Sequence, residues 1–519
     1  MFKVFQHDIS DPEHFVVTLE LVPKRVSFGR SVDTILAIAK DAYVDGRISA
    51  VSITDNPGGN PSLSPDAIGY EIFNIGMDVI VHFTCRDMNR IGLESRALQL
   101  ARMGMKNILA LTGDYTGQGF GGQGAPVFDL DSVTLICMLN RLSERLYQSG
   151  DPDLFFTGCA VSPFKVTEAE SFAQYAKLGR KLNAGASFIT TQLGYDSRKY
   201  EEVSRLIKKM SPDVPMLGSV YLLSPKAARA MNKGLVPGAL VTDQLFKQVQ
   251  DEWKDKKQGL KLAVERTAQL ALTLKKLGYR GIHIGGVHRS YKTVANILDR
   301  MDEMEKTGEF FFDNFNFSSS KTYYAFSDNL DHKSFSSSRK KLSRLEKLKF
   351  CFLKKGHDIF FSFDSPVAPL CRMLAEWIDK RNLGRLFRML FEDPVKGSLL
   401  ECRKCGDCGI PHLAFQCPES GCPKHIRNGA CGGSKNGMCE VFPDRRCVWV
   451  KAYNRLISIN QTDIMTNEWV PPRMWELNYT SSWLNFHLKR DHHSKLSDLV
   501  KSCSLDTCRF DSAMFHQKL

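Results

Sequence analysis

Long apolar runs are missing from this chain of 519 residues. No window approaches the ~20 apolar residues that span a bilayer, so we predict no transmembrane segment. The N-terminal residues MFKVFQHDISDPEHF contain no basic stretch followed by an apolar one, so we also expect no secretory signal. The protein is therefore predicted to be cytoplasmic, where clustered cysteines serve as metal ligands more often than as disulfides.

The composition excludes further classes of protein. Hydrophobic residues make up 43% and charged residues 24% of the chain, unlike mostly disordered, collagen-like or small disulfide-stapled proteins. The net charge of +13 is concentrated, because residues 331–355 contain nine Lys or Arg against two acidic residues. A nucleic-acid-binding protein would spread basic residues over a folded face, so we predict no nucleic-acid partner.

Short apolar runs alternate with amphipathic stretches from residue 16 to about residue 305. Eight runs have the Val/Ile/Leu-rich composition of strands buried on both faces. They are 16–22, 50–55, 78–85, 107–114, 155–161, 187–195, 215–223 and 281–287. Eight strand–helix units in this length predict a (β/α)8 barrel. A doubly wound open sheet is the alternative, and the lack of GxGxxG after the first run disfavours it.

Polar residues follow nearly every predicted strand. Active sites of such barrels lie at the C-terminal ends of the strands, so we interpret these residues as the rim of a site. The set includes Glu20, Thr54, His82, Asp114, Gln192, Tyr221 and Arg289. The loop Asn56–Pro61 is rich in Gly, Pro and Asn and exposes bare backbone, whereas Gly113 and Asp114 place a carboxylate directly after a glycine. There is neither a Ser/His/Asp arrangement nor an HExxH motif.

Five of these stretches, in this order, resemble the methylenetetrahydrofolate reductase family over about residues 14–305. They are Leu19-Glu20-Leu21-Val22-Pro23, Ser52-Ile53-Thr54, His82-Phe83-Thr84-Cys85, Leu109-Ala110-Leu111-Thr112-Gly113-Asp114, and Ala184-Gly185-Ala186 leading to Thr191-Gln192. The resemblance implies a flavin enzyme. In that family FAD lies in the mouth of the barrel and reduces the methylene carbon that bridges two nitrogens of tetrahydrofolate.

The resemblance also implies roles for individual residues. Glu20 corresponds to the general acid and Asp114 to a catalytic carboxylate near the flavin and the pterin. By this resemblance Gln192 binds the pterin, Asp114 lies near it, and Thr54, His82 and Lys181 contact the flavin. A family Phe that stacks on folate has no clear counterpart, and Tyr221 or Leu223 takes its place. The positions at the strand ends add Tyr221 and Arg289 to the predicted substrate contacts and Gly113 and Asp114 to the predicted cofactor contacts. A structural reading competes for His82, which lies inside an apolar strand and is equally expected as a core histidine. Thr112 and Gln174 replace an Arg and an acidic residue that the family often has there.

The chain changes character after the barrel. We predict a Ser-rich basic linker at 306–356, a helical and cysteine-rich domain at 357–492 and a polar tail at 493–519, after a barrel domain at 1–305. In the linker, Leu342, Leu345, Leu348 and Phe352 recur at helical spacing. We expect a basic amphipathic helix there that packs on its own protein, with a membrane surface or a partner as the alternative.

Eight of the 15 cysteines lie in the cysteine-rich domain. They are Cys402, Cys405, Cys408, Cys417, Cys422, Cys431, Cys439 and Cys447. Two cysteines separated by two residues can bind one metal ion or cluster, and both iron–sulfur and zinc sites use such spacings. Eight thiolates suffice for two sites, so we predict a metal-binding domain and leave iron–sulfur and zinc open.

This domain also resembles the C-terminal cysteine-rich module of some methylenetetrahydrofolate reductases, over about 385–492. The resemblance rests on Asn428-Gly429-Ala430-Cys431-Gly432-Gly433, Cys447-Val448-Trp449 and Thr480-Ser481-Ser482-Trp483. It implies a metal-bearing module and suggests that this module delivers electrons to the flavin. The electrons would come from NAD(P)H or, through this domain, from an electron-transfer partner.

The leading hypothesis is the FAD-dependent reduction of 5,10-methylenetetrahydrofolate to 5-methyltetrahydrofolate. We expect a folate-type pterin substrate and carry a homo-oligomer as a further candidate assembly. Two alternatives stay open at this point. One is pterin-dependent methyl transfer with zinc thiolates, and the other is a non-catalytic subunit that binds a pterin or a flavin.

Overall fold

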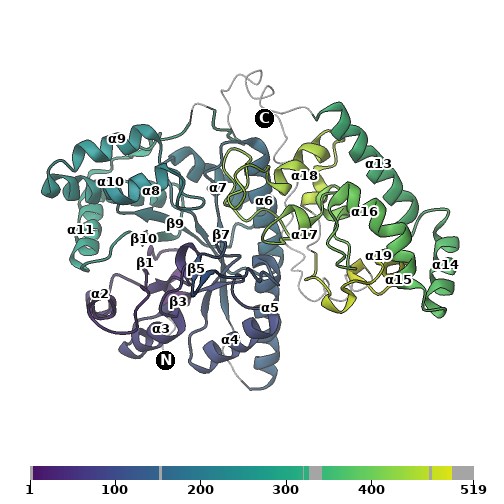
Figure 1. Ribbon diagram of the computed structural model, residues 1–519. Helices are drawn as coiled ribbons and strands as arrows, with labels where there is room; N and C mark the ends of the chain where they lie inside the picture. Colours follow the sequence, from purple (N-terminus) through teal and green to yellow (C-terminus); the bar gives the residue numbers. More distant parts are fainter. Residues whose placement is uncertain (1–3, 151–154, 320, 327–341, 467–469, 494–519) are drawn as a thin grey trace.

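Eight parallel strands close into a barrel in the computed structural model (Figure 1), which describes residues 4–150, 155–319, 321–326, 342–466 and 470–493. Around the barrel the order is β1-β10-β9-β8-β7-β4-β3-β2. The strands are β1 (Val16–Leu21), β2 (Ala50–Ile53), β3 (Val79–Thr84), β4 (Asn107–Leu111), β7 (Phe156–Val161), β8 (Phe188–Thr191), β9 (Met216–Tyr221) and β10 (Gly281–Gly285). All eight predicted strands are present.

The closure of the sheet is visible in the register of the first strand. Thr18 lies opposite Ala50 of β2 on one side and opposite His283 of β10 on the other. The first strand thus pairs with both the second and the last strand of the barrel, so the sheet has no free edge. The prediction of a (β/α)8 barrel is confirmed, and the doubly wound alternative is wrong.

Helices surround the strands. They are α2 (Arg30–Asp45), α3 (Pro65–Ile75), α4 (Arg90–Arg102), α5 (Ser132–Gln148), α6 (Glu168–Asn183), α7 (Ser197–Met210), α8 (Pro225–Asn232), α9 (Asp243–Glu252), α10 (Lys256–Lys276) and α11 (Lys292–Thr307). A capping box starts α6, where Thr167 and Glu170 satisfy each other's backbone N–H groups. Every residue of α6 from Glu168 to Leu182 is buried, because the C-terminal part of the chain covers its outer face.

The short helix α1 (Val4–Ser10) closes the N-terminal end of the barrel. Phe5 is fully buried, with its ring centroid 5.9 Å from that of Phe156 and 5.3 Å from that of Phe188. Ile9 belongs to the same apolar cluster. One end of the barrel is therefore filled with aromatic side chains, and the other end stays available for a site.

Two small features follow the strands without being part of the barrel. The loop after β4 contains a hairpin of β5 (Gln118–Gly119) and β6 (Gly122–Gln123). The described residues between 308 and 326 lie on the barrel, where the Tyr324 hydroxyl donates to Asp196 Oδ2 (2.7 Å) and Phe315 is buried. The first part of the predicted linker is thus packed against the start of α7.

The cysteine-rich domain contains little regular structure around its cysteines (Figure 1). Its helices are α13 (Arg344–Phe360), α14 (Ala368–Lys380), α15 (Gly384–Phe387), a π-turn (Arg388–Glu392), α16 (Asp393–Leu400), α17 (Pro418–Gly421), α18 (Val448–Ile457) and α19 (Ser482–His487). The predicted amphipathic helix is present as α13, although Leu345, Leu348 and Phe352 are exposed and Phe350 is buried. Residues 327–341 and 494–519, which contain much of the basic stretch and the predicted tail, lie outside the described residues.

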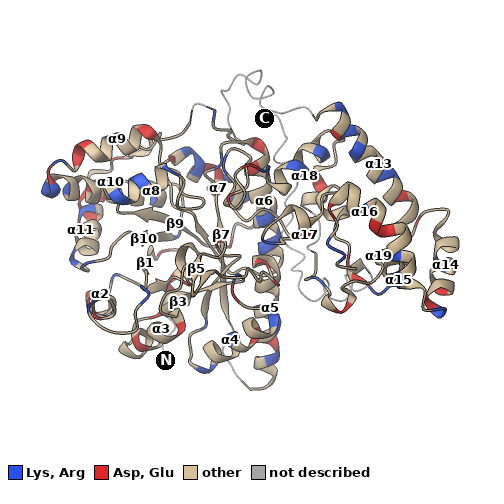
Figure 2. Ribbon diagram, viewed as in Figure 1, with Lys and Arg blue, Asp and Glu red and all other residues tan. Residues whose placement is uncertain are grey.

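Charged side chains are distributed over both parts of the molecule. Figure 2 shows Lys and Arg beside Asp and Glu on most outer helices, with several basic residues along α13. None of the described helices is long and apolar enough to cross a bilayer.

Candidate functional site

The C-terminal ends of the strands form the barrel mouth, where most of the predicted site residues lie. Glu20 lies in β1 and Tyr221 at the end of β9, while Thr54 and Gln192 directly follow β2 and β8. Leu111 ends β4, so Thr112, Gly113 and Asp114 begin the loop after it. The parallel strands thus place chemistry-bearing residues from distant parts of the sequence at one end of the barrel.

Glu20 has the environment of a general acid. Burial raises the pKa of its carboxyl from 4.5 to about 7. Among the residues that the structure describes, none donates a hydrogen bond to it. The neighbouring position on β10 is Gly285, where a Cβ would lie 3.0 Å from Glu20 Oε2 and 3.0 Å from the Tyr221 ring. Glu20 is thus half-buried at the mouth, its carboxyl has no partner among the described residues, and it lies next to Gly285, where the barrel wall has no side chain.

The two motifs that the sequence singled out meet at this mouth. Asp114 Oδ2 accepts a hydrogen bond from the backbone N–H of Gly58 (3.0 Å), and the Gly59 carbonyl accepts one from Gly117 N–H (2.9 Å). Gly113 has φ +91°, and a Cβ there would lie 3.1 Å from Thr84 Cβ. The glycine is thus required both by its conformation and by the close approach of β3.

Asp55, by contrast, has a structural role. Its Oδ2 accepts hydrogen bonds from the backbone N–H of Thr84 (3.2 Å) and from the Thr84 hydroxyl (3.0 Å), and it forms an ion pair with Arg96 (2.8 Å). Arg96 also pairs with Asp66 at 2.6 Å. These buried pairs tie the ends of β2 and β3 to α3 and α4.

Two buried hydroxyls at the mouth have no protein partner. The side-chain oxygens of Thr54, after β2, and Ser162, after β7, are inaccessible to solvent and make no hydrogen bond within the described chain. An unsatisfied buried hydroxyl is costly, so such groups call for a ligand or ordered water. These hydroxyls fit a polar cofactor held at the strand ends.

His82 belongs to a polar layer inside the barrel. Its Nε2 lies 2.9 Å from Ser52 Oγ, and His283 Nδ1 lies 2.8 Å from Thr18 Oγ1. Burial lowers the pKa of His82 to about 4 and that of His283 to about 3, so both rings are neutral at pH 7. These contacts favour the interpretation of His82 as a satisfied core histidine.

The other predicted contact residues lie in different surroundings. Lys181 of α6 is buried, donates to the Ala160 carbonyl of β7 (2.5 Å) and has a pKa that burial lowers to about 8. Gln192 donates to the Pro237 carbonyl (3.2 Å), which places it against the loop before α9. Burial raises the pKa of Tyr221 to about 12. Arg289 is exposed after β10.

The cysteine-rich domain reaches the barrel mouth directly. Lys424 donates to the Gly113 carbonyl at 2.8 Å and forms an ion pair with Glu440. Lys165, after β7, donates to the Gly432 carbonyl and to the Ser434 carbonyl (2.8 Å). The loop that contains Cys431 therefore lies on the ends of β4 and β7.

Helix α6 holds the same loop from the side. Gln174 Nε2 donates to the Ala430 carbonyl (3.3 Å), and Lys177 Nζ donates to the Gly429 carbonyl (3.4 Å) and to Thr112 Oγ1 (3.3 Å). A Cβ at Gly429 would lie 2.6 Å from Lys177 Cβ. The Asn-Gly-Ala-Cys-Gly-Gly motif thus fits against the barrel only because residue 429 has no side chain.

The eight cysteines separate into two groups. The first cysteine group comprises Cys402, Cys405, Cys408 and Cys417, and the second comprises Cys422, Cys431, Cys439 and Cys447. In the first, the thiol of Cys408 interacts electrostatically with those of Cys402 and Cys417, and Cys405 interacts with Cys408. The second lines one small cavity, into which Lys424 and Glu440 also project. The groups follow the sequence order, four and four.

Buried lysines surround both groups, which fits an anionic metal–thiolate centre. Lys396 interacts with the first group, and Lys165, Lys177 and Lys424 interact with the second. Burial raises the pKa of Cys408 to about 11 and that of Cys431 to about 12, so the thiolates need a compensating cation. All eight are free of disulfides.

Each cysteine group has the ligand set of either kind of metal centre. Zinc ions and iron–sulfur clusters are both bound by four thiolates.

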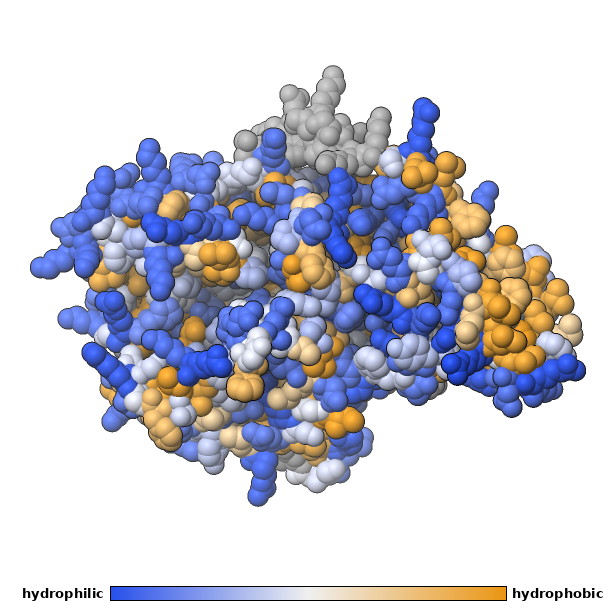
Figure 3. All heavy atoms as spheres, viewed as in Figure 1, coloured by the Kyte–Doolittle hydropathy of each residue, from blue (hydrophilic) through white to orange (hydrophobic). Residues whose placement is uncertain are grey.

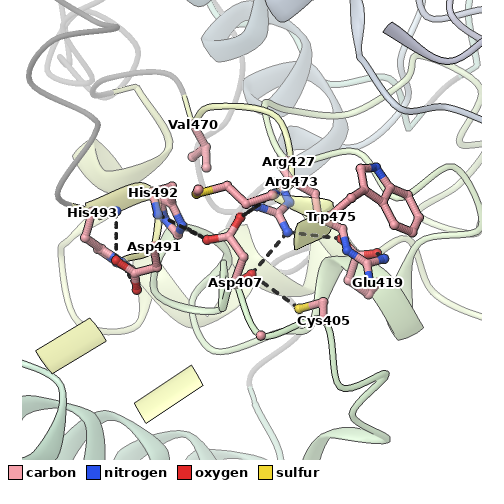
Figure 4. Close-up of polar contacts among 12 residues, drawn as sticks. Cys405, Asp407, Glu419, Arg427, Val470, Arg473, Trp475, Asp491, His492 and His493 are labelled. Carbon is pink, nitrogen blue, oxygen red and sulfur yellow. Dashed lines mark hydrogen bonds and ion pairs between the residues drawn. The ribbon is translucent and has the colours of Figure 1, made fainter. Parts of the chain in front are cut away.

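A buried charge network joins the first cysteine group to the C-terminal segment (Figure 4). Asp407 is fully buried, and its carboxylate contacts Arg427 Nη1 (2.7 Å) and His492 Nδ1 (2.5 Å). Burial alone would raise the pKa of Asp407, but the Arg427 and His492 side chains hold it far below its usual range. Glu419 continues the network, with Arg427 at 3.3 Å and Arg473 at 3.1 Å.

Two further histidines adjoin this network. His412 Nε2 lies 2.9 Å from His492 Nε2, and His493 Nδ1 lies 3.0 Å from Asp491 Oδ2. With Asp407 fixing the tautomer of His492, the bond between the two Nε2 atoms is satisfied when His412 donates. His412, His492 and Asp407 therefore form a continuous chain of hydrogen bonds.

Sequence reasoning missed the lysines that join the two domains. Lys165, Lys177 and Lys424 lie in stretches without a distinctive pattern, and their partners lie more than 60 residues away. The only local signal was Gly432-Gly433 beside Cys431, a backbone that another element can approach closely.

The fold and the mouth define a class: a (β/α)8 barrel with a desolvated carboxyl at its strand ends and a thiol-rich module packed on the rim. The chain belongs to the methylenetetrahydrofolate reductase family, whose model, described as methylenetetrahydrofolate reductase, matches residues 6–302. A second family model, described as methylene-tetrahydrofolate reductase C terminal, matches residues 387–476. Both resemblances inferred from the sequence are confirmed.

Curated relatives match smaller parts of the chain. A probable methylenetetrahydrofolate reductase (NADPH) of Caenorhabditis elegans is 27% identical over 146 residues, covering 28% of this chain and 20% of the relative. Methylenetetrahydrofolate reductase 1 of Schizosaccharomyces pombe is 23% identical over 268 residues, covering 50% and 42%. The chain thus spans about a fifth and about two fifths of the lengths of these relatives.

Solved structures resemble the chain only loosely. An uncharacterized protein from Clostridium thermocellum that binds two copies of 5-methyl-5,6,7,8-tetrahydrofolic acid has 12% identity and a TM-score of 0.39, covering 59% of this chain and 99% of its own. A 2,3-dimethylmalate lyase has 14% identity and a TM-score of 0.31, covering 64% and 93%. TM-scores this low carry no inference about this chain.

Proposed function

We propose that this protein reduces 5,10-methylenetetrahydrofolate to 5-methyltetrahydrofolate with FAD in the barrel mouth. The family membership supports a folate-related reductase, and the environment of Glu20 is the observation that supports this chemistry best. Bound FAD would accept electrons and deliver a hydride to the methylene carbon of the substrate. Residues of the chain supply the proton and bind the cofactor and the substrate.

Glu20 acts as the general acid. The five-membered ring of the substrate opens when the departing nitrogen receives a proton, and a carboxyl with a pKa of about 7 still holds that proton near neutral pH. Because Glu20 has no described hydrogen-bond donor, its proton is available to a ligand. Gly285 lets Glu20 Oε2 and the Tyr221 ring pack against the backbone of β10, which fixes the position of the carboxyl.

Thr54, Gly113 and Lys181 would hold the cofactor. The unpartnered hydroxyl of Thr54 offers a hydrogen bond to the cofactor, and Gly113 lets the loop after β4 pass close to Thr84 at the end of β3. Asp114, fixed by Gly58 N–H, would place a negative charge where a cationic iminium of the substrate forms. Gln192, Tyr221 and Arg289 remain the proposed substrate contacts.

Electrons would enter through the cysteine-rich domain rather than from NAD(P)H. Iron–sulfur clusters held by the two cysteine groups would supply single electrons. The second cysteine group supports this route, because its Cys431 loop is hydrogen-bonded to the residues that follow β4 and β7. An external electron-transfer partner would then reduce the first group, which precedes the second in the sequence.

Substitution of Glu20 by Gln tests the reaction. The variant should retain FAD but lose turnover with methylenetetrahydrofolate by about 10²–10⁴-fold, the usual contribution of a general acid. Glu94→Gln, which changes an exposed carboxylate on α4, serves as the matched control and should keep the wild-type rate. A Glu20→Gln enzyme that works within a few-fold of the wild type would contradict the assignment.

A second experiment tests the electron route. Reduced methyl viologen should support turnover in the wild type, and Cys431→Ser should lose this activity at least tenfold. The same variant should still reduce substrate when its flavin is photoreduced directly. If NADH or NADPH drives the Cys431→Ser variant as well as the wild type, the electrons do not pass through the cysteine-rich domain.

The two alternatives predict different properties of the purified protein. Methyl transfer by zinc thiolates predicts zinc without iron, sulfide or flavin. A non-catalytic subunit predicts that Glu20→Gln leaves pathway activity intact. The raised pKa of the unpaired Glu20 carboxyl favours catalysis over the non-catalytic alternative.

A further inference from the structure

Three histidines from two distant segments meet beside Asp407, outside both cysteine groups. His412 lies in the 3-10 turn Pro411–Leu413, whereas His492 and His493 follow α19. One ring nitrogen of each histidine lies within 4.8 Å of one ring nitrogen of each of the others. Nitrogen atoms that converge from segments 80 residues apart are arranged as the ligands of a single metal ion are.

Carboxylates fix the orientation of two of these rings (Figure 4). Asp407 Oδ1 accepts a hydrogen bond from the backbone N–H of His492 (3.3 Å) and lies 2.5 Å from Nδ1 of the same residue. Asp491 holds His493 in the same way, with Oδ1 accepting from the backbone N–H (3.2 Å) and Oδ2 lying 3.0 Å from Nδ1. A carboxylate at one ring nitrogen keeps the proton there and leaves the lone pair of the other nitrogen to a metal, as behind most metal-binding histidines.

The rings are spaced for one ion. His412 Nε2 lies 2.9 Å from His492 Nε2, and the ring centroids of His492 and His493 are 4.0 Å apart. Nitrogens that bind one tetrahedral zinc ion, each ~2.0–2.1 Å from it, lie ~3.3 Å from one another. A small movement of His412 therefore lets an ion replace the hydrogen bond between the two Nε2 atoms. The proton of His412 then lies on Nδ1, and the ring stays neutral.

The surroundings keep these rings unprotonated. Burial lowers the pKa of His412 well below its usual range, and it also lowers that of His492. Arg180 and Arg427 act in the same direction at His412, because their positive charges oppose a further cation on the ring. The rings thus keep lone pairs for a metal at pH 7, and the two carboxylates behind them offset the charge of a divalent ion.

Apolar side chains border the site on one side. The ring centroid of Phe486 in α19 lies 5.3 Å from that of His493, and Phe361 lies 5.8 Å from Phe486. Figure 3 shows that hydrophobic side chains also gather on the outer face of this domain, over α13–α16. His492 is fully buried, whereas 21% of the His493 side chain is exposed. Solvent therefore reaches the site at His493, where water can occupy a fourth ligand position.

The carboxylates are less suited to bind the ion directly. Asp407, Asp491 and His492 form a second grouping with ligand atoms within 4.8 Å of one another. Asp407, however, already contacts Arg427 Nη1 (2.7 Å) and accepts a hydrogen bond from the backbone N–H of Met474 (3.2 Å). Coordination by Asp407 would break a buried ion pair, which is strongly destabilising.

We propose that His412, His492 and His493 bind one divalent transition-metal ion, with zinc as the expected ion. Imidazole nitrogens suit zinc, whereas magnesium and calcium prefer oxygen ligands. The ion would link the segment after α19 to the turn that follows the first cysteine group. The site contains none of the eight clustered cysteines and none of the residues of the barrel mouth, so the proposal is independent of the proposed reaction.

Metal analysis of the full chain tests the site. Anaerobically purified protein is incubated with Zn²⁺ and desalted. The wild type should retain one zinc ion per chain more than His412→Gln/His493→Gln, with the same content of iron and sulfide. The matched control is His7→Gln, which changes an exposed histidine of α1 and should retain as much zinc as the wild type. Equal zinc in the wild type and the double variant would overturn the proposal.

Wild-type protein provides a second measurement in case the double variant does not fold. X-ray absorption at the zinc edge should show imidazole nitrogens ~2.0–2.1 Å from the ion. A spectrum with only sulfur neighbours at ~2.3 Å would place all the zinc in the cysteine groups and would overturn the proposal. A wild type that retains no zinc would overturn it as well.

Asp491 is proposed as a positioning residue for His493. Asp491→Asn should weaken zinc binding by about 10–100-fold, the usual effect of losing a partner behind a metal ligand. Competition with a chromogenic chelator measures this affinity, and the iron content should not change. An unchanged zinc affinity would contradict the proposed orientation of His493.

Discussion

The barrel and the cysteine-rich domain are held together in different ways. Inside the barrel, Leu19, Val51, Val81 and Ile108 are fully buried in strands whose backbone groups are paired on both sides. Among the described non-glycine residues, twelve have positive φ, and ten of these lie after residue 381. The cysteine-rich domain therefore keeps a costly backbone that regular structure does not stabilise.

The difference shows where each domain obtains its stability. Apolar burial and strand pairing suffice for the barrel, which should fold without any bound group. In the cysteine-rich domain, the buried Asp407–Arg427 pair links irregular loops, and the eight clustered cysteines form no disulfide. We therefore expect metal binding and folding to be one process in this domain, and separate processes in the barrel.

Loss of a metal centre should have the largest effect. Cys408→Ser should release the metal of the first cysteine group and unfold the surrounding loops, because metal binding and folding are coupled there. Hydrogen exchange should become fast in residues 402–447 and stay slow in β1 and β4. The control is Cys351→Ser, since Cys351 is a partly exposed thiol outside both groups. Equal loss of protection in the barrel would show that the two domains fold as one.

Substitution of Asp407 by Asn should come next. It leaves Arg427 buried without a full counter-charge, which typically destabilises a fold by about 3–5 kcal/mol. Only the thermal transition that releases iron should move to a lower temperature. Asp299→Asn removes an exposed partner of Arg47 and should cost less than about 1 kcal/mol. Similar shifts for the two variants would refute the importance of the buried network.

A substitution at the closed end of the barrel should destabilise the barrel and leave the cysteine-rich domain unchanged. Phe5→Ala empties the space beside Phe156 and Phe188 and should lower the free energy of unfolding of the barrel by about 3–5 kcal/mol. Iron content should not change. Phe120, which is fully exposed in the β5–β6 hairpin, provides the control, since Phe120→Ala should have no effect on unfolding.

Glu20 should produce the smallest change in stability and one that depends on pH. Its folded-state pKa of about 7 lies above the usual ~4.3 of an unfolded chain, so the native state loses stability as pH rises between these values. Glu20→Gln removes that penalty and should raise the melting temperature at pH 8 but not at pH 4. The expected gain is about 1–3 kcal/mol.

The catalytic rate should depend on the same group and should also fall as pH rises. Turnover of the wild type should fall as pH rises above about 7, where Glu20 loses its proton. A melting temperature of Glu20→Gln that differs from the wild type equally at pH 4 and pH 8 would contradict the raised pKa.

The barrel could be predicted from the sequence because its signals are local. Each buried strand is a continuous apolar run, and Glu20 and Asp114 are marked by their positions at the ends of such runs. The (β/α)8 topology then follows from the regular alternation. The chemistry at Glu20 depends on desolvation, which a strand end makes plausible but does not determine.

The relation between the domains could not be predicted in this way. Lys424 and Gly113 are separated by 311 residues, and no sequence pattern in either stretch predicts their contact. The division of the cysteines also depends on how irregular loops fold, because Cys-Pro occurs in both groups at Cys417 and Cys422. Leu345 and Leu348 likewise look like residues that pack on their own domain, whereas the structure leaves them exposed.

The central claim is that the cysteine-rich domain and the flavin barrel form one electron path to a folate substrate. The most direct measurement is the absorbance spectrum of anaerobically purified, fully reduced protein as methylenetetrahydrofolate is added. We expect flavin and iron–sulfur absorbance to return together, with one 5-methyltetrahydrofolate formed for every two electrons lost. A protein without flavin absorbance, or one in which only the flavin is reoxidised while the cysteine-bound metal stays reduced, would contradict the account.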